Sequence, residues 1–381
     1  MNNKIITLLE PTWDRHTHLP GNLGLLRITC LAFPEAAINY VGGQAQIDLI
    51  KESAPTEIVS RVQFHAWQTG QDKDTLPTNV YRAIKNFKSL PAEIIEHATQ
   101  LIFCSITASA LNAVNLLGLA PKCWSMLHGN ANDLHGWRSR NPFRRYFDFR
   151  AVLERHCHQG GHVMALEDRI VSNLSEQYPW MRDHLTCLPH PLTPEEAAPH
   201  DQIRPLGYPV KIGFAGNASL EKGFAEFLQL ASALNETHPD QFEFHAVGRL
   251  ARDAEHLDQS PLTRKTAEHA LARNDYVEQL GSMHYLFTWH RNSYYGNAAS
   301  GVVYDAINLG IPLFARDTAQ LAFWKKADIE IADAFNDLDS AIQFLRSGID
   351  TNKYQRHLSA LTRLREQFSD TNIANILREH V

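Results

Sequence analysis

Short apolar runs alternate with helical segments along this chain, and this alternation constrains its fold more than any other feature. The pattern begins at Ile5–Leu9, and it starts again in the second half at Val210–Gly216. Apolar runs of strand length that are bounded by turn formers are typical of buried strands. Strands that alternate with helices form parallel sheets with right-handed crossovers. The sequence therefore predicts an α/β protein.

A segment rich in proline and charged residues, 192–208, separates the two halves and has the composition of a linker. With 381 residues the chain is too long for one compact core, which fits two domains. We predict two Rossmann-like domains, at 1–195 and 205–360, whose parallel sheets face a central cleft. The last segment, 361–381, is predicted to be a helix that packs back on the first domain.

The overall composition excludes several classes of protein. The chain is 44% hydrophobic and 20% charged, which is ordinary for a soluble globular protein. It contains no apolar run of bilayer-spanning length and does not begin like a signal peptide, so we expect a cytoplasmic protein. A net charge of −6 gives no support for a nucleic-acid partner. The five cysteines are scattered and odd in number, which indicates reduced thiols rather than a disulfide framework.

In the second half, a short helix is predicted between two buried strands. The run Tyr285–His290 has the length of a strand, Ser300 is a good N-cap, Gly310 suits the left-handed residue after a helix, and Pro312 stops its continuation. A helix that begins at small residues directly after a strand presents free N–H groups to a phosphate. Asp305, one turn into the helix, could reach a hydroxyl beside that phosphate. The alternative is an ordinary strand–helix–strand unit.

In the first half, polar side chains follow two predicted strands. His16, His18 and Asn22 lie in or just after the loop behind the first strand, and His128 and Gly129 follow a buried strand further along. Functional loops sit at such strand ends in α/β sheets, so these groups could touch a substrate. The alternatives are a solvated loop in the first case and a histidine bonded to backbone in the second.

Two further segments have alternative interpretations. Trp137–Tyr146 combines arginines with aromatic residues, which fits a patch for a phosphate-bearing acceptor or an anionic membrane surface, or else a solvated helix face. His156–His162 contains three histidines and a cysteine and suggests zinc. Its spacing does not place the ligands on one side of a helix, so structural or surface histidines are the better interpretation.

The turn from Gly216 to Gly223 resembles the donor-phosphate loop of GT-B glycosyltransferases, especially glycosyltransferase family 4. In that family an arginine, four intervening residues before a lysine, grips the nucleotide diphosphate. Here the lysine is Lys222, and Asn217 occupies the arginine position. The loss of the arginine removes a bidentate phosphate donor.

A second motif of the family is a pair of glutamates separated by seven residues, followed by a small-residue helix and Gly-x-Pro. Its spacing falls here on Asn297 and Asp305, followed by Gly310-Ile311-Pro312. In the family the second acid binds the nucleotide ribose and the first contacts the transferred sugar. Asn297 cannot be a carboxylate, whereas Asp305 keeps the charge. His128 resembles the family histidine that touches the donor sugar.

The resemblance implies a hexosyltransferase-like enzyme of glycan biosynthesis, which moves a sugar from a nucleotide-diphosphate sugar to a glycan, lipid-linked or protein acceptor. It implies no cofactor and no metal, because cations and helix N-termini can take the charge of the leaving phosphate. Peripheral association with the inner face of a membrane could accompany this activity. The alternatives are a nucleotide-sugar 2-epimerase of the same fold or a degenerate nucleotide-sugar binding protein.

The resemblance and the strand-end loops together give three predicted groups of site residues. The catalytic group is His128, Lys222 and Asn297. The donor-binding group is Gly216, Asn217, Lys222, Ser300, Gly301, Val302 and Asp305. The acceptor-side group, expected in the first domain, is His18, Asn22 and Asp133, and either His18 or Asp133 could act as a base.

Overall fold

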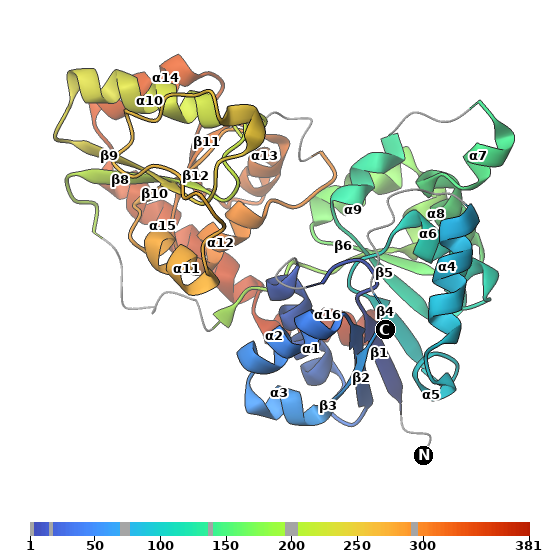
Figure 1. Ribbon diagram of the computed structural model, residues 1–381. Coiled ribbons are helices and arrows are strands. Elements are labelled where there is room, and N and C mark those ends of the chain that lie inside the picture. The colour runs from blue at the N-terminus through green and yellow to red at the C-terminus, as the bar shows by residue number, and fades with distance from the viewer. Residues whose placement is uncertain (1–3, 15–17, 69–76, 136–139, 195–204, 291–295) are drawn as a thin grey trace. The chain divides into compact units, whose positions relative to one another are not determined.

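The computed structural model describes residues 4–14, 18–68, 77–135, 140–194, 205–290 and 296–381 (Figure 1). It divides the chain into two compact units. Unit 1 consists of Met1–Leu192, Asn297–Ala299 and Phe368–Val381, and unit 2 of Thr193–Gly296 and Ser300–Gln367. Each unit is built around a parallel sheet, so the α/β class predicted from the alternation of strands and helices is confirmed.

Unit 1 contains a seven-stranded parallel sheet in the order β3-β2-β1-β4-β5-β6-β7. Its strands are β1 (Ile5–Leu9), β2 (Ala37–Gly42), β3 (Val62–Ala66), β4 (Gln100–Phe103), β5 (Cys123–Leu127), β6 (His162–Ala165) and β7 (Leu185–Cys187). From β1 the chain first builds to one side and then returns to place β4 on the other side. The loops after β1 and β4 therefore diverge, and ligands bind at such a switch point in open α/β sheets.

Helices cover both faces of this sheet. They are α1 (Leu19–Ala32), α2 (Gln44–Ser53), α3 (Thr56–Arg61), α4 (Pro77–Lys88), α5 (Ala92–Ile95), α6 (Ala108–Leu116), α7 (Pro142–Tyr146), α8 (Phe149–His158), α9 (Asp168–Gln177) and α16 (Asp370–His380). Alternate residues of β4 divide between two apolar cores, with Leu101 and Phe103 in one and Ile102 in the other. This period of two is what a strand buried on both faces requires.

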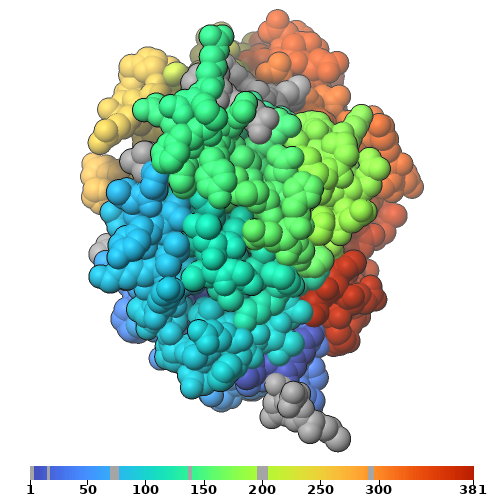
Figure 2. Space-filling model, turned by 90° about the vertical axis from the view of Figure 1, so that its right-hand side faces the viewer, coloured from blue at the N-terminus to red at the C-terminus, as the bar shows by residue number. Residues whose placement is uncertain are grey.

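The C-terminal helix α16 belongs to unit 1, where it packs on α1. The Arg27 guanidinium donates to both carboxylate oxygens of Asp370, at 2.8 and 3.2 Å, and to the Leu192 carbonyl at 2.7 Å. Figure 2 shows this end of the chain, in red, at the molecular surface. The C-terminal segment, 361–381, contains the end of α15 (Thr351–Gln367), which belongs to unit 2, followed by α16.

Unit 2 contains a five-stranded parallel sheet in the order β12-β11-β10-β8-β9. Its strands are β8 (Val210–Ala215), β9 (Phe242–Val247), β10 (Tyr285–Thr288), β11 (Leu313–Arg316) and β12 (Ala332–Phe335). Its helices are α10 (Phe224–Thr237), α11 (Arg273–Gly281), α12 (Gly301–Leu309), α13 (Ala319–Lys326), α14 (Leu338–Ser347) and α15 (Thr351–Gln367). The strand order reverses between β8 and β10, so the loops after these two strands form the switch point of this sheet.

An aromatic cluster fills the core of unit 2. Phe214 of β8 lies 5.1 Å from Phe224 and 5.5 Å from Phe227, measured between ring centroids, and Phe227 lies 5.2 Å from Phe287 of β10. Tilted and edge-to-face rings at these separations add to the stabilisation that burial alone provides. The cluster fixes α10 against the sheet, and with it the turn that leads from β8 into α10.

Candidate functional site

A cavity of about 660 Å³ opens at the carboxyl edge of the unit 1 sheet, at the switch point between β1 and β4. This volume lies within the range of roughly 300–1,000 Å³ that is usual for ligand pockets. The loops after β1, β4 and β5 supply most of the wall. The cavity is lined by Thr12, Trp13, His18, Ser105, Ile106, Thr107, Ala108, His128, Gly129, Asn130, Asp133, Asp148 and Phe149.

Two predicted histidines meet in this cavity. The rings of His18 and His128 lie 4.5 Å apart, and Trp13 lies 5.3 Å from His18. Nε2 of His128 is 2.7 Å from the Cys104 carbonyl, so this nitrogen carries the proton and Nδ1 keeps a lone pair. Burial lowers the pKa of His18 to about 3 and that of His128 to about 4. Both rings are therefore neutral near pH 7 and can hydrogen bond to hydroxyl groups without carrying charge.

The loop after β1 is organised by Glu10, which the sequence analysis did not identify. Glu10 is fully buried, and its Oε1 accepts hydrogen bonds from the Thr12 and Trp13 backbone at 3.0 and 3.1 Å and from the Ser105 hydroxyl. Burial raises the pKa of Glu10, although these donors oppose the shift. The available signal was an acid placed directly after a buried strand. Glu10 holds the cavity wall in place.

Asn22, predicted on the acceptor side, is buried and donates to Glu10 Oε2 at 3.1 Å and to Gln46 Oε1 at 3.2 Å. Asn22 does not line the cavity, whereas Asp133, also predicted on the acceptor side, does. His16 lies outside the described residues.

Asn297 belongs to unit 1, although the sequence places it in the second domain. Its backbone N–H donates to Asn132 Oδ1 at 3.0 Å, and its side-chain amide contacts Nε2 of His135. The next residue, Ala298, accepts from Arg169 Nη2 at 3.4 Å. The contacts of Asn297 tie the short segment 297–299 to the loop that follows β5, which also carries His128 and Asp133, and the contact of Ala298 ties it to α9.

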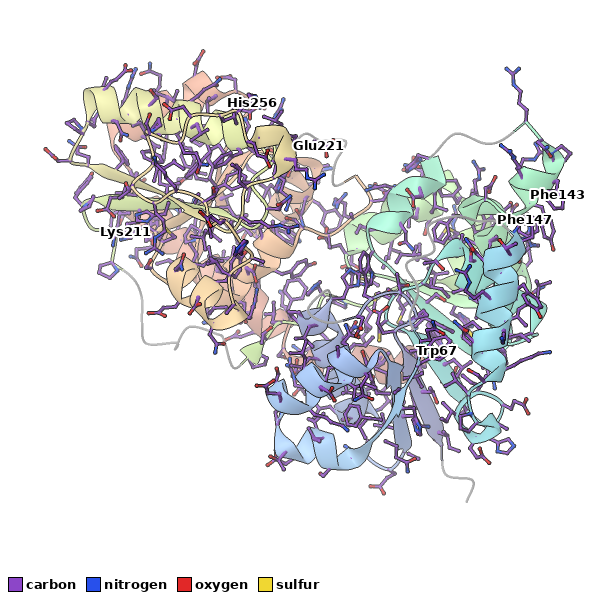
Figure 3. All side chains as sticks on the ribbon, viewed as in Figure 1. Trp67, Phe143, Phe147, Lys211, Glu221 and His256 are labelled. Carbon is purple, nitrogen blue, oxygen red and sulfur yellow. The ribbon has the colours of Figure 1, made fainter. Side chains whose placement is uncertain are left out.

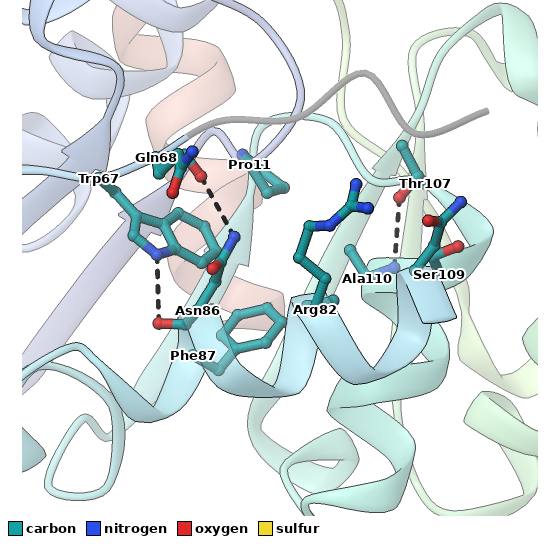
Figure 4. Close-up of a pocket in the computed structure, with 11 residues that line it drawn as sticks. Pro11, Trp67, Gln68, Arg82, Asn86, Phe87, Thr107, Ser109 and Ala110 are labelled. Atoms are coloured by element: carbon teal, nitrogen blue, oxygen red, sulfur yellow. Dashed lines mark hydrogen bonds between the residues drawn. The ribbon is translucent and has the colours of Figure 1, made fainter. Parts of the chain in front are cut away.

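A second hollow in unit 1 lies between α4 and the start of α6, beside the large cavity, with which it shares Thr107. Figure 4 shows Arg82 in its wall, with the Trp67 indole donating to the Asn86 carbonyl at 3.2 Å. Its volume of about 130 Å³ is well below that of usual ligand pockets.

In unit 2, three glycines bring the loops of the switch point close together. Gly216, Gly223 and Gly248 have φ values of 84°, 85° and 142°, which side chains rarely adopt. A Cβ atom on Gly248 would clash with the Gly216 carbonyl, and one on Gly223 would lie 2.6 Å from the Cβ of Trp289. The turn after β8 therefore touches both the loop after β9 and the end of β10.

The side chain of Lys222 lies over this turn. Its Nζ is 3.9 Å from the position that a Cβ on Gly216 would occupy. Burial lowers the pKa of Lys222, and burial together with the Lys222 charge lowers the pKa of His290 to about 4. Within the described part of the chain, no hydrogen bond or ion pair joins the Lys222 amine to another residue. A largely buried cation without a counter-charge is costly, and a bound anion would compensate it.

Helix α12 starts at Gly301 with Ser300 as N-cap, and Gly310 ends it with φ 64°, so these parts of the sequence prediction are confirmed. The Ser300 hydroxyl is fully buried and has no hydrogen-bond partner among the described residues. Val302, in the first turn, is also buried. Among the described residues, the first turn of α12 therefore offers backbone N–H groups and a hydroxyl without partners, which is what an anion requires.

Asp305 is already held by helix α11. Its two carboxylate oxygens accept from Arg273 Nη2 at 2.9 Å and from the Tyr276 hydroxyl at 3.0 Å. Neither partner was identified from the sequence. A carboxylate has about four lone-pair positions, so two stay available to a ligand. Asn308, three residues after Asp305 in α12, is buried and donates to the Thr193 carbonyl at 3.0 Å.

Asn217 accepts a hydrogen bond from Nε of Arg249 at 3.3 Å. Arg249 lies in the loop after β9, 32 residues further along the chain. The sequence carried no signal for this contact, because the approach of the two loops is a property of the sheet order.

The described residues give no support for a zinc site, a disulfide or a membrane-spanning helix. His156 is buried and its Nδ1 lies 2.8 Å from Asn115 Oδ1. Among the residues that the structure describes, no three His, Cys, Asp or Glu side chains gather as metal ligands. All five cysteines are described, and each is a free thiol. In the same part of the chain, no helix is both long and apolar enough to cross a bilayer.

Comparisons with known proteins place this geometry in a familiar fold. No protein-family model matches the sequence, and no curated protein matches it either. Solved structures do match the whole chain. A glycosyltransferase from Rickettsia africae ESF-5 is 14% identical, with a TM-score of 0.64, and the match covers 100% of this chain and 98% of that one. Sucrose-phosphate synthase from Thermosynechococcus elongatus is 14% identical, with a TM-score of 0.66, over 99% and 98%.

The E. coli trehalose-6-phosphate structure bound with UDP-2-fluoro glucose matches at 11% identity and a TM-score of 0.61, over 99% of both chains. The chain has a glycosyltransferase fold. Two Rossmann-like units with parallel sheets are the GT-B architecture that the sequence motifs implied, and this prediction is confirmed.

Proposed function

We propose that this protein is a glycosyltransferase that moves a sugar from a nucleotide-diphosphate sugar to an acceptor hydroxyl. The observation that carries the proposal is Lys222, a largely buried amine without a counter-charge at the switch point of unit 2. Its place in a fold shared with glycosyltransferases over the full chain supports this function rather than another anion-binding role.

On the donor side, Lys222 and the first turn of α12 would hold the diphosphate. As the bond between the sugar C1 and the diphosphate oxygen breaks, negative charge grows on the leaving phosphate. Lys222 and the N–H groups of Gly301 and Val302 are of the type that stabilises such charge. Asp305, oriented by Arg273 and Tyr276, would accept hydrogen bonds from the ribose hydroxyls.

On the acceptor side, the wall of the unit 1 cavity contains polar side chains, among them two neutral histidines. His18 and His128 can accept and donate hydrogen bonds to hydroxyl groups, as recognition of a sugar requires, and His128 would contact the transferred sugar. Asp133 lines the same cavity and is a candidate to take the proton of the acceptor hydroxyl as its oxygen bonds to C1. Asn297 would orient this loop through its contacts with Asn132 and His135.

We also propose that the acceptor is a glycan or lipid-linked molecule presented at an anionic membrane face. The side chains of Phe143 and Tyr146, both in α7, are 63% and 45% exposed, and Arg144 and Arg145 lie between them in the sequence. Figure 3 places Phe143 and Phe147 together at the outer edge of unit 1. Exposed aromatic rings beside arginines match the interface of an anionic bilayer. Residues 137–139 of this segment lie outside the described residues.

Vesicle co-sedimentation tests the membrane proposal. Vesicles with anionic lipid should retain the protein, and purely zwitterionic vesicles should not. The variant Arg144→Ser/Arg145→Ser should bind anionic vesicles roughly 10- to 30-fold more weakly, at about 1 kcal/mol per arginine. Equal binding of the variant and the wild type would refute this role of α7.

The catalytic proposal is tested by incubating the protein with UDP-, GDP- and ADP-sugars without acceptor and following the sugars by NMR. Slow release of free sugar and nucleotide diphosphate is expected for a transferase, because water replaces the acceptor. Epimerised donor would indicate the nucleotide-sugar 2-epimerase instead. Binding without turnover, even after a panel of sugar acceptors is added, would indicate a nucleotide-sugar binding protein.

A further inference from the structure

The loops after β8 and β9 are held together by backbone contacts that fix the position of Arg249. The N–H of Ala218 donates to the Arg249 carbonyl, and the N–H of Ala251 donates to the Ala218 carbonyl, both at 2.9 Å. Gly248 approaches Gly216 so closely that a side chain there would clash with backbone. Arg249 therefore emerges from a rigid frame beside Asn217.

The Arg249 side chain is oriented by Asn217 without being neutralised. Its Nε donates a hydrogen bond to Asn217 Oδ1 at 3.3 Å. Among the described residues, Asn217 is the hydrogen-bond acceptor of this guanidinium. An amide oxygen orients the group, whereas a carboxylate would also cancel its charge. A guanidinium has five N–H donors, so the four on Nη1 and Nη2 stay available, and the side chain is exposed.

Lys222 and Arg249 carry two positive charges to the same turn from two different loops. Lys222 lies over Gly216, and Arg249 contacts the residue that follows it. Neither forms an ion pair within the part of the chain that the structure describes. The two cations also differ in kind, since an ammonium is a point charge and a guanidinium presents two parallel N–H groups that fit two phosphate oxygens.

We propose that Arg249, oriented by Asn217, is a binding residue for the diphosphate of the nucleotide-sugar donor. The inference rests on the proposed function, which it deepens by naming the second cation of the site. The turn lacks an arginine at position 217, and Arg249 brings a guanidinium to the same turn from the neighbouring loop. Its role is bidentate binding of phosphate oxygens, while Lys222, which lies over Gly216, supplies a single point charge.

The test uses UDP, GDP and ADP as probes, with the corresponding monophosphates for comparison. Isothermal titration of the wild type first identifies the diphosphate that binds. Arg249→Ala should weaken that diphosphate about 10- to 100-fold, the range for hydrogen bonds to charged groups, and should weaken the monophosphate less. Arg252→Ala is the matched control, because Arg252 is also exposed and follows in the same loop, and it should bind like the wild type.

A relocation variant makes the test specific for the guanidinium. Asn217→Arg in the Arg249→Ala background returns an arginine to the turn from the other loop, and it should recover at least tenfold of the lost affinity. Asn217→Ala alone should weaken the diphosphate only a few fold, because it removes orientation and not charge. Thermal unfolding of each variant checks that the fold is intact.

The possible failures are distinguishable. If the wild type binds none of the three diphosphates, the proposed function is refuted together with this inference. If the wild type binds one of them and folded Arg249→Ala binds it equally well, only the role of Arg249 is overturned. Equal loss for Arg249→Ala and Arg252→Ala would overturn it as well, since nonspecific charge would then explain both.

Discussion

Replacing Lys222 is the most direct test of the donor site, because this residue is costly to the fold unless it binds an anion. The amine is largely buried, its pKa is lowered by that burial, and within the described residues it has no counter-charge. Lys222 also precedes α10, which begins at Phe224, so its charge opposes the positive end of the helix dipole. Lys222→Ala should therefore leave the thermal stability of the ligand-free protein unchanged or slightly higher.

The kinetic effect should be large and should appear mainly in kcat. If Lys222 neutralises the leaving phosphate, its contribution grows as the bond breaks, so kcat falls more than KM rises. Loss of one preorganised donor of this kind costs about 100- to 1,000-fold in kcat. The assay is steady-state transfer, or donor hydrolysis where no acceptor is found.

Lys211→Ala serves as the matched control. Lys211 lies at the start of β8, and its Nζ is 3.8 Å from Glu243, whereas the turn with Lys222 follows the other end of the strand. Figure 3 shows Lys211 and Glu221, the neighbour of Lys222, at opposite ends of unit 2. The control should keep its kcat. A folded Lys222→Ala protein with near-normal kcat would refute the assignment of the donor site.

The pH dependence of the protein's stability tests the burial of the Lys222 amine without any ligand. The folded pKa lies below the unfolded value, so between the two the unfolded chain binds more protons. The free energy of unfolding then rises with pH through this alkaline window and levels off above the unfolded pKa. Lys222→Ala should lose this rise. A variant with the same pH profile as the wild type would mean that the amine is not buried in solution.

Three further predictions concern other parts of the site. His128 is neutral in the fold with a pKa of about 4, below the pKa of a histidine in the unfolded chain. Between these two pKa values the free energy of unfolding should fall as the pH drops, by up to about 1.4 kcal/mol per pH unit. Urea unfolding of His128→Gln should show a weaker dependence on pH, and an unchanged dependence would contradict the neutral state. Asp305→Ala should weaken the binding of a nucleotide diphosphate by about 1.5–3 kcal/mol. It should cost little stability, since its ion-pair partner Arg273 is a partly exposed side chain. A loss of stability with unchanged affinity would show that Asp305 has only a structural role. Turnover should survive EDTA, because Lys222 and α12 take the charge, and activity that returns only with added Mn²⁺ or Mg²⁺ would contradict the metal-independent mechanism.

Local sequence patterns predicted the elements of the fold where the determinants are themselves local. Ser300 and Gly310 mark the ends of α12 as predicted, and Gly310 does so because a left-handed glycine acts on its own backbone, whereas the Ser300 hydroxyl donates or accepts no capping hydrogen bond among the described residues. The pattern failed where an edge contact decides the structure. The amphipathic pattern of Leu262–Gly281 predicts a helix over this whole segment. In the structure α11 begins only at Arg273, and the preceding segment pairs with β9 through Arg264. Helix propensity is a weak tendency that such tertiary pairing overrides.

The polar contacts of the site were less predictable, since each joins residues that are distant in sequence. Arg273 reaches Asp305 and Arg249 reaches Asn217, each across 32 positions. No periodicity or spacing rule relates such pairs, and they follow only from the order of the strands. The family resemblance predicted Asp305 and Asn217 as site residues, but the groups that orient them could be found only from the fold.

Two ionisable groups at the strand ends show how a structural residue differs from one available to a ligand. Glu10 is fully buried, yet Thr12, Trp13, Asn22 and Ser105 donate hydrogen bonds to its carboxylate, so the protein itself offsets part of the cost of burial. Lys222 is largely buried and receives no such compensation within the described residues. A fold selected for stability alone would pair such an amine or replace it by an apolar side chain. The missing partner is therefore expected to come from outside the chain, at the turn where Gly216, Gly223 and Gly248 bring the loops of the switch point together.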